Sequence, residues 1–254
     1  MSKMWIRRSK SSPRFRACGP PAPQRRGRIL GALLLPLLLA ACGEKAEQSP
    51  FPKPKRPVSP ITSASYSNED ARDSVREAET VMDLADIEAG MYVADIGAGE
   101  GYYTVRLSPL VGRNGRVLAQ DIVPETRDNL ARRVNRENLH NVGVKLGEPN
   151  DPLLPDRSFD RIFLIHMYHE IERPSEFLWN LRADLKKHGR VVVVDADRPT
   201  DRHGTPPRML ICEFAAVGYQ LTRFERLQDS ESYFAQFEGA GPRPEPKDIP
   251  VCPA

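Results

Sequence analysis

Short apolar runs alternate with helical patterns through the middle of this 254-residue chain. The apolar runs predict five strands, at 92–96, 117–119, 142–146, 159–165 and 189–194. Between them, apolar residues recur at helical spacing in 102–111, 124–138 and 175–185. Strands that alternate with helices in this way predict an α/β protein with a mainly parallel sheet.

The C-terminal part of the pattern is different. A helix is predicted at 207–217, and it is followed by strands at 219–225 and 233–238. Only residues 226–232 separate the last two strands, which is too short a connection for a parallel crossover. These two strands are therefore predicted to form an antiparallel hairpin.

Upstream of the first strand, residues 67–85 predict one further helix. Ser67 or Asn68 can cap it, and apolar residues including Val75 and Val81 recur at helical spacing.

The stretch from Tyr92 to Asp121 combines a strand, a glycine-rich turn, a helix and a second strand. The turn contains Gly97, Gly99 and Gly101, and the second strand ends at Asp121. Glycines let the backbone approach a ligand, and a helix start offers unpaired N–H groups. An acid about 20 residues beyond the glycines can accept hydrogen bonds from ribose hydroxyls. The pattern favours a nucleotide-type site over a glycine turn that binds nothing.

The glycine spacing separates two ligand classes. A dinucleotide site usually has the pattern G-x-G-x-x-G, whereas here the third glycine comes one residue early and Tyr102 holds its usual place. Asp95 lies two residues before the first glycine, which gives D-x-G-x-G-x-G. This pattern resembles the first motif of class I methyltransferases that use S-adenosylmethionine, and it disfavours a nicotinamide oxidoreductase.

The resemblance covers about residues 66–240. It implies a Rossmann-like α/β fold with helices on both faces of a seven-stranded, mostly parallel sheet that ends in an antiparallel hairpin. The segment 203–207 is also similar to one in a bacterial methyltransferase group of unassigned substrate.

The resemblance further implies S-adenosylmethionine as the cofactor and a set of residues around it. The methionine end would be lined by Asp95, Gly97, Gly99 and Gly101. Asp121 would hold the ribose. The acid that addresses the adenine would be Glu148, which follows Gly147, or else Asp151.

Three of the five histidines map to the carboxyl ends of neighbouring predicted strands, where open α/β sheets bind ligands. His166 and His169 follow the strand at 159–165, and His203 follows the strand at 189–194. A neutral histidine can act as a base at neutral pH, so these three are the catalytic candidates, with Asp195 as an alternative base. Each could equally be structural. The sequence offers no third ligand beside His166-x-x-His169, so no metal site is predicted.

The first 41 residues have the composition of an export leader. They contain nine basic residues, all within residues 3–28, and no acid. The apolar run at 29–41 comes after these basic residues. The formal charge is +3 for the whole chain, which leaves −6 from Cys42 onward and argues against nucleic acid as a partner. The sequence Leu39-Ala40-Ala41-Cys42 resembles the lipobox of bacterial lipoproteins. It implies a signal peptide over 1–41, a lipid on Cys42 and anchoring in the cell envelope.

The remaining segments and cysteines add two expectations. Residues 42–65 are Pro-rich and predict an extended tether, and 241–254 predict an irregular tail. Cys212 and Cys252 could pair in an oxidising compartment, although two cysteines do not fix a pairing.

The expected function is methyl transfer from S-adenosylmethionine to an unidentified small-molecule or envelope acceptor. The alternative is a non-catalytic envelope lipoprotein that keeps the fold to bind a nucleoside or a partner. The two remain open because S-adenosylmethionine is made in the cytoplasm, whereas the leader predicts export.

Overall fold

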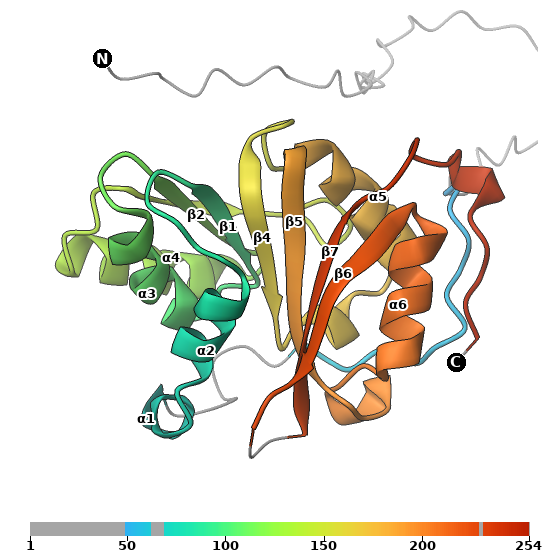
Figure 1. The fold of residues 1–254 in the computed structure, drawn as a ribbon, viewed down its shortest axis with the longest axis horizontal. Coiled ribbons are helices and arrows are strands. Elements are labelled where there is room, and N and C mark those ends of the chain that lie inside the picture. The colour runs from blue at the N-terminus through green and yellow to red at the C-terminus, as the bar shows by residue number, and fades with distance from the viewer. Residues whose placement is uncertain (1–48, 62–68, 229–230, 254) are drawn as a thin grey trace, which may run out of the picture. The chain divides into compact units, whose positions relative to one another are not determined.

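The computed structural model describes residues 49–61, 69–228 and 231–253 (Figure 1). Residues 49–254 form one compact unit. The expected leader and the candidate lipid site at Cys42 lie outside the described residues. In the described part, no helix has both the length and the apolar character needed to span a bilayer.

A single seven-stranded sheet organises the domain, in the order β3-β2-β1-β4-β5-β7-β6. Its strands are β1 Tyr92–Ile96, β2 Arg116–Asp121, β3 Val142–Leu146, β4 Phe159–Ile165, β5 Leu185–Ala196, β6 Tyr219–Arg226 and β7 Ser232–Gly239. The first five strands pair in parallel, and β7 lies antiparallel between β5 and β6. The predicted Rossmann-like sheet and its C-terminal hairpin are confirmed.

Within the described residues, six α-helices flank this sheet, and Figure 1 shows their arrangement. They are α1 Glu69–Ser74, α2 Glu77–Leu84, α3 Tyr102–Val111, α4 Pro124–Arg136, α5 Pro174–Asp184 and α6 Pro207–Ala216. Neighbouring strand residues point to opposite faces, so Val93 packs with the α2 and α3 side while Ala94 packs with the α5 and α6 side. The central strand β4 is buried on both faces, which explains its continuous apolar run.

The helix expected at 67–85 is broken within its described part. Arg76 separates α1 from α2 and has a left-handed backbone with φ of 52°. A residue in this conformation cannot continue a right-handed helix. Val75, which the periodicity assigned to the apolar face, is 48% exposed. The periodic pattern was right about α2 but wrong about one continuous helix.

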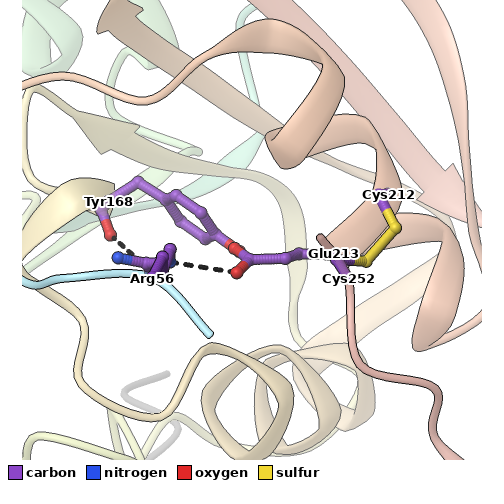
Figure 2. The surroundings of a disulfide bond; sticks show 5 residues. All are labelled: Arg56, Tyr168, Cys212, Glu213 and Cys252. Atoms are coloured by element: carbon purple, nitrogen blue, oxygen red, sulfur yellow. Dashed lines mark hydrogen bonds and ion pairs between the residues drawn. A yellow bond between two sulfur atoms is a disulfide. The ribbon is translucent and has the colours of Figure 1, made fainter. Parts of the chain in front are cut away.

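Residues 49–61 lie on the domain, which differs from the free tether expected for 42–65. Arg56 fixes this segment, since its side chain is only 1% exposed and its Nε donates to Glu213 at 3.0 Å. The guanidinium also donates to the backbone carbonyls of Ile171 at 3.1 Å and Tyr168 at 3.4 Å. The Tyr168 hydroxyl donates to the same Glu213 carboxylate at 2.7 Å (Figure 2).

A disulfide joins Cys212 of α6 to Cys252 in the C-terminal segment (Figure 2). The Cα atoms are 5.9 Å apart and the two residues are separated by 40 positions in the sequence. The bond lies beside Glu213, the partner of Arg56, so both chain ends of the described domain attach to the same helix.

We expect removal of this disulfide to lower the free energy of unfolding by about 4 kcal/mol, because a loop of this length is no longer closed in the unfolded chain. Urea denaturation of a Cys212→Ser/Cys252→Ser variant would measure the loss. Dithiothreitol should shift the midpoint of the parent protein and leave that of the variant unchanged. Equal midpoints for the two oxidised proteins would contradict the expectation.

Candidate cofactor and catalytic site

A cavity of about 390 Å³ lies at the carboxyl ends of β1, β2 and β4. Most of its wall comes from the ends of β1, β2 and β4 and from the turns after β1, β2, β3 and β4, at 96–100, 120–122, 148–149, 165–167 and 170–172. Residues 58–61, two residues of α1, Tyr102 of α3 and Phe177 of α5 complete it. The volume is within the range of small-molecule sites, roughly 300–1,000 Å³. The position is where open α/β sheets bind ligands.

The three glycines of the turn after β1 have left-handed backbones but different surroundings. Gly97 and Gly99 line the cavity. A Cβ at Gly99 would have no described atom within 4 Å, whereas one at Gly101 would collide with Leu130 of α4. Gly101 is not part of the cavity wall. Its lack of a side chain serves the packing of α3 against α4, which differs from the expected contact with the cofactor.

Asp121 lies where the sequence predicted a ribose-binding acid. Its Oδ2 accepts a hydrogen bond from the Gly99 N–H at 3.1 Å, and its Oδ1 accepts one from the Val123 N–H at 2.9 Å. The residue lines the cavity and is 7% exposed. Each carboxylate oxygen has a further lone pair, so Asp121 can hold the turn and still accept hydrogen bonds from a ligand.

Asp95 does not line the cavity, which differs from the expectation. It is buried at the end of β1, and its Oδ2 accepts a hydrogen bond from the Thr104 hydroxyl of α3 at 2.6 Å. Burial raises the pKa of Asp95 to about 6, against the opposite effect of the Thr104 hydroxyl. Its contacts therefore join β1 to the first turn of α3.

The two candidates for the adenine side also separate. Glu148 lines the cavity, whereas Asp151 does not. The Asp151 Oδ1 accepts a hydrogen bond from the Leu153 N–H at 2.8 Å, and its backbone bridges back to Glu148. Asp151 thus shapes the loop that carries Glu148.

Sequence reasoning missed Gln120, the residue before Asp121. It lines the cavity, is 1% exposed, and its Oε1 is buried without a hydrogen-bond partner among the described residues. A Cβ at Gly147 would overlap the Gln120 amide, so this glycine makes room for the side chain. An unsatisfied polar atom at a cavity wall is a position where a ligand group could bond. A polar residue between the buried Ala119 and Asp121 was the only sequence signal.

Arg72 was also missed, and it closes the cavity from α1. Its guanidinium lies 3.8 Å from the centre of the Tyr102 ring and pairs with Glu77 at 2.7 Å. Tyr102 lines the cavity beside it, while Tyr103 is buried against Phe163. Of these two tyrosines, Tyr102 is the one that reaches the cavity.

Of the three candidate histidines, only His166 lines the cavity. It follows β4 with a left-handed backbone, φ 53°, and its Nε2 lies 3.3 Å from a Glu77 carboxylate oxygen. Burial opposes ionisation of Glu77, but His166 and Arg72 outweigh it and lower the pKa of Glu77 to about 2. The ionised Glu77 orients the imidazole at the edge of the cavity.

His169 and His203 lie together outside the cavity wall. His169 is 2% exposed, and its Nδ1 is 3.0 Å from an Asp195 oxygen. Asp195 also accepts hydrogen bonds from the Thr205 hydroxyl at 2.7 Å and the Ala196 N–H at 2.9 Å. The His169 and His203 rings are 5.5 Å apart and nearly perpendicular. Asp195 is thus fully engaged as the partner of His169.

Comparison with known proteins agrees with this geometry. Residues 94–193 match the family model described as a methyltransferase domain. A protein-L-isoaspartate O-methyltransferase from Methanothrix thermoacetophila is 30% identical over 113 residues, which are 44% of this chain and 51% of that protein. A ubiquinone/menaquinone biosynthesis C-methyltransferase from a Marinomonas species is 34% identical over 119 residues, 44% of this chain and 45% of that protein. The chain thus spans about half the length of the curated relatives it matches.

Solved structures share the fold. A methyltransferase from Aquifex aeolicus, described as dependent on S-adenosylmethionine, has a TM-score of 0.62 and 24% identity, and covers 68% of this chain and 98% of its own. The [4+2]-cyclase SpnF has a TM-score of 0.59 and 13% identity, and covers 75% of this chain and 89% of its own. These structures share the fold of this chain, and residues 94–193 match a methyltransferase domain.

The two glycines that differ in surroundings allow a matched test. Gly99→Ala should cost about 1–2 kcal/mol of stability for the left-handed backbone, and it should weaken S-adenosylmethionine binding because its methyl group faces the cavity. Gly101→Ala should lower the free energy of unfolding by roughly 1–3 kcal/mol more than Gly99→Ala does, since its methyl group collides with Leu130. Urea denaturation and calorimetric titration measure the two effects. Equal losses of stability and affinity in both variants would contradict the assignment.

Proposed function

We propose that this protein transfers the methyl group of S-adenosylmethionine to a small-molecule or envelope acceptor. The observation that carries the proposal is the Asp121 carboxylate, which lines the cavity and accepts a hydrogen bond from Gly99 in the turn after β1. The same carboxylate holds the turn through Gly99 and lies where a ribose hydroxyl is expected to bind.

The cavity wall offers groups for each part of the cofactor. Asp121 would hold the ribose hydroxyls, and the exposed backbone at Gly97 and Gly99 would face the methionine end. Glu148 and Gln120, which also line the cavity, would meet the adenine. When bound, the cofactor supplies an electrophilic methyl group on its sulfonium, and transfer then needs an acceptor held close and in line.

The base in this proposal is His166, because it is the candidate histidine that lines the cavity. Methyl transfer to an oxygen or nitrogen commonly requires that a base take the acceptor's proton. The contact between His166 Nε2 and Glu77 fixes the ring and would stabilise the imidazolium that forms when the proton arrives. Arg72 holds Glu77 in turn.

We further propose that the protein acts in the cell envelope. The leader, the lipobox-like sequence before Cys42 and the Cys212–Cys252 disulfide support this location. Disulfides persist in exported proteins and are rare in the cytoplasm. The same observations favour a second candidate, a non-catalytic lipoprotein that binds a nucleoside or a partner in this cavity, since S-adenosylmethionine is made in the cytoplasm.

The deciding experiment is calorimetric titration of the purified protein with S-adenosylmethionine and S-adenosylhomocysteine. We expect both to bind to the parent protein and Asp121→Asn to weaken binding at least tenfold, because the variant loses the charge-assisted bonds. Asp128→Asn, on the exposed surface of α4, is the matched control and should bind normally. Absence of binding at millimolar ligand in the folded parent protein would rule out the enzyme.

His166→Gln separates binding from transfer in the same assay series. We expect its affinity for S-adenosylmethionine to stay within a factor of three. Transfer of tritiated methyl groups to an extract of envelope small molecules should fall by roughly 10²–10⁴, the usual worth of a positioned base. Unchanged transfer would remove His166 from the mechanism, and no transfer by the parent protein despite cofactor binding would favour the non-catalytic candidate.

The envelope location has its own test. We expect the parent protein to incorporate radiolabelled palmitate and to sediment with membranes, and we expect Cys42→Ser to abolish both. Cys18→Ser is the control, because Cys18 lies within the segment that would be removed. Palmitate incorporation that survives Cys42→Ser would refute the assignment of the lipid site.

A further inference from the structure

Three potential metal ligands converge beside the cavity. His169 and Glu170 belong to the 3₁₀ turn Tyr168–Glu170 that follows β4, and His203 follows the 3₁₀ turn Thr200–Arg202 after β5. One ligand atom from each of the three residues lies within 4.8 Å of the others. The sequence did not suggest this set, because 33 residues separate Glu170 from His203 and only the parallel pairing of β4 with β5 brings them together.

The chemistry of the set favours a divalent transition ion. Two imidazoles and one carboxylate are the protein ligands of many catalytic zinc sites and of non-haem iron sites. Ions such as magnesium and calcium prefer oxygen ligands alone. The mixture of nitrogen and oxygen donors therefore points to zinc or a neighbouring first-row ion.

Asp195 supplies the carboxylate that commonly holds a metal-ligating histidine by a hydrogen bond. It faces His169 Nδ1 at 3.0 Å, which leaves Nε2 as the ring nitrogen that can bind an ion. Histidine ligands usually donate their other ring N–H to a carboxylate, which fixes the tautomer and raises the basicity of the ligand. Asp195 is 1% exposed and is itself held by Thr205, so His169 is oriented before any ion arrives.

The segment before the domain also fixes the two histidines. Ser59, which is 3% exposed, donates its backbone N–H to the His169 carbonyl at 3.3 Å. The Ser59 hydroxyl accepts a hydrogen bond from the His203 N–H at 3.2 Å. One buried serine thus connects both ligand-bearing turns through their backbones.

We propose that His169, Glu170 and His203 form a binding site for a divalent transition ion, with Asp195 as the positioning residue for His169. Bonds of about 2.0–2.1 Å in a tetrahedral site place the ligand atoms roughly 3.3 Å apart. Binding would therefore draw the three atoms together by about 1.5 Å at most. Glu170 and His203 are half-buried. Glu170 also lines the cavity, so the ion would lie at its border.

Metal titration tests the site without any methyl-transfer assay. The full chain, purified from membranes with its affinity tag removed and dialysed against a chelator, is titrated with Zn²⁺ by calorimetry and with Co²⁺ by visible absorption. We expect one equivalent of Zn²⁺ with a dissociation constant in the micromolar range or below, and a cobalt spectrum typical of mixed nitrogen and oxygen ligands.

The variants identify the ligands. His203→Gln and Glu170→Gln are both in half-buried turns, and each should weaken Zn²⁺ binding at least tenfold while circular dichroism stays unchanged. Asp195→Asn should weaken it by roughly 10–100-fold, the usual effect of an outer partner. The matched control is His188→Gln, an exposed histidine at the start of the β5 apolar run, which should bind Zn²⁺ as the parent does.

Three results would overturn the proposal. The first is the absence of saturable binding at one equivalent in the folded parent protein. The second is a His203→Gln/Glu170→Gln double variant that binds as tightly as the parent. The third is a loss of affinity in His188→Gln equal to the loss in His203→Gln. None of these readings depends on S-adenosylmethionine, so failure of the metal site and failure of the methyltransferase proposal are separate outcomes.

Discussion

The hydrogen bond from the Gly99 N–H to the Asp121 carboxylate is the contact on which the site depends. It joins the turn after β1 to the end of the adjacent strand β2, two points that parallel pairing brings to one edge of the sheet. A buried carboxylate is costly unless its oxygens are bonded, and here two backbone N–H groups bond it. The turn and the acid thus fix each other, and the cavity opens beside them.

A second set of buried polar groups attaches residues 49–61 to α6 and to the loop after β4. Arg56, Glu213 and the Tyr168 hydroxyl form a connected group in which the guanidinium bonds carbonyls from the loop after β4. A buried ion pair adds little net stability, because desolvation offsets much of the attraction. Its geometric effect is clearer, since the contacts of Arg56 with Glu213 and with the carbonyls of Tyr168 and Ile171 position the segment on the domain. That placement puts residues 58–61 into the cavity wall.

The sequence predicted the sheet well because its signals are local. Apolar runs such as 159–165 identify buried strands, and the short connection between β6 and β7 forces an antiparallel hairpin. Of the site residues expected from the sequence, Gly97, Gly99, Asp121, Glu148 and His166 line the cavity, because each lies at or just after the carboxyl end of a strand. Asp95 and Gly101 match the methyltransferase pattern equally well, but neither lines the cavity. The Asp95 side chain bonds Thr104 of α3, and a Cβ at Gly101 would collide with Leu130 of α4. Periodicity could not reveal the break at Arg76, which depends on one left-handed residue, nor the contacts of Arg56, which join residues more than 100 positions apart.

The packing of residues 49–61 also constrains where the proposed enzyme could act. Cys42 and Val58, which lines the cavity, are 16 positions apart in the sequence. A chain of this length extends over at most about 55 Å. A lipid on Cys42 would therefore keep the cavity within that distance of the membrane surface. Because the segment is fixed at Arg56, the greatest distance between Cys42 and the domain is shorter than it would be for a free tether that runs to residue 65. An acceptor that is itself dissolved in or bound to the membrane fits this constraint better than one that diffuses through the whole compartment.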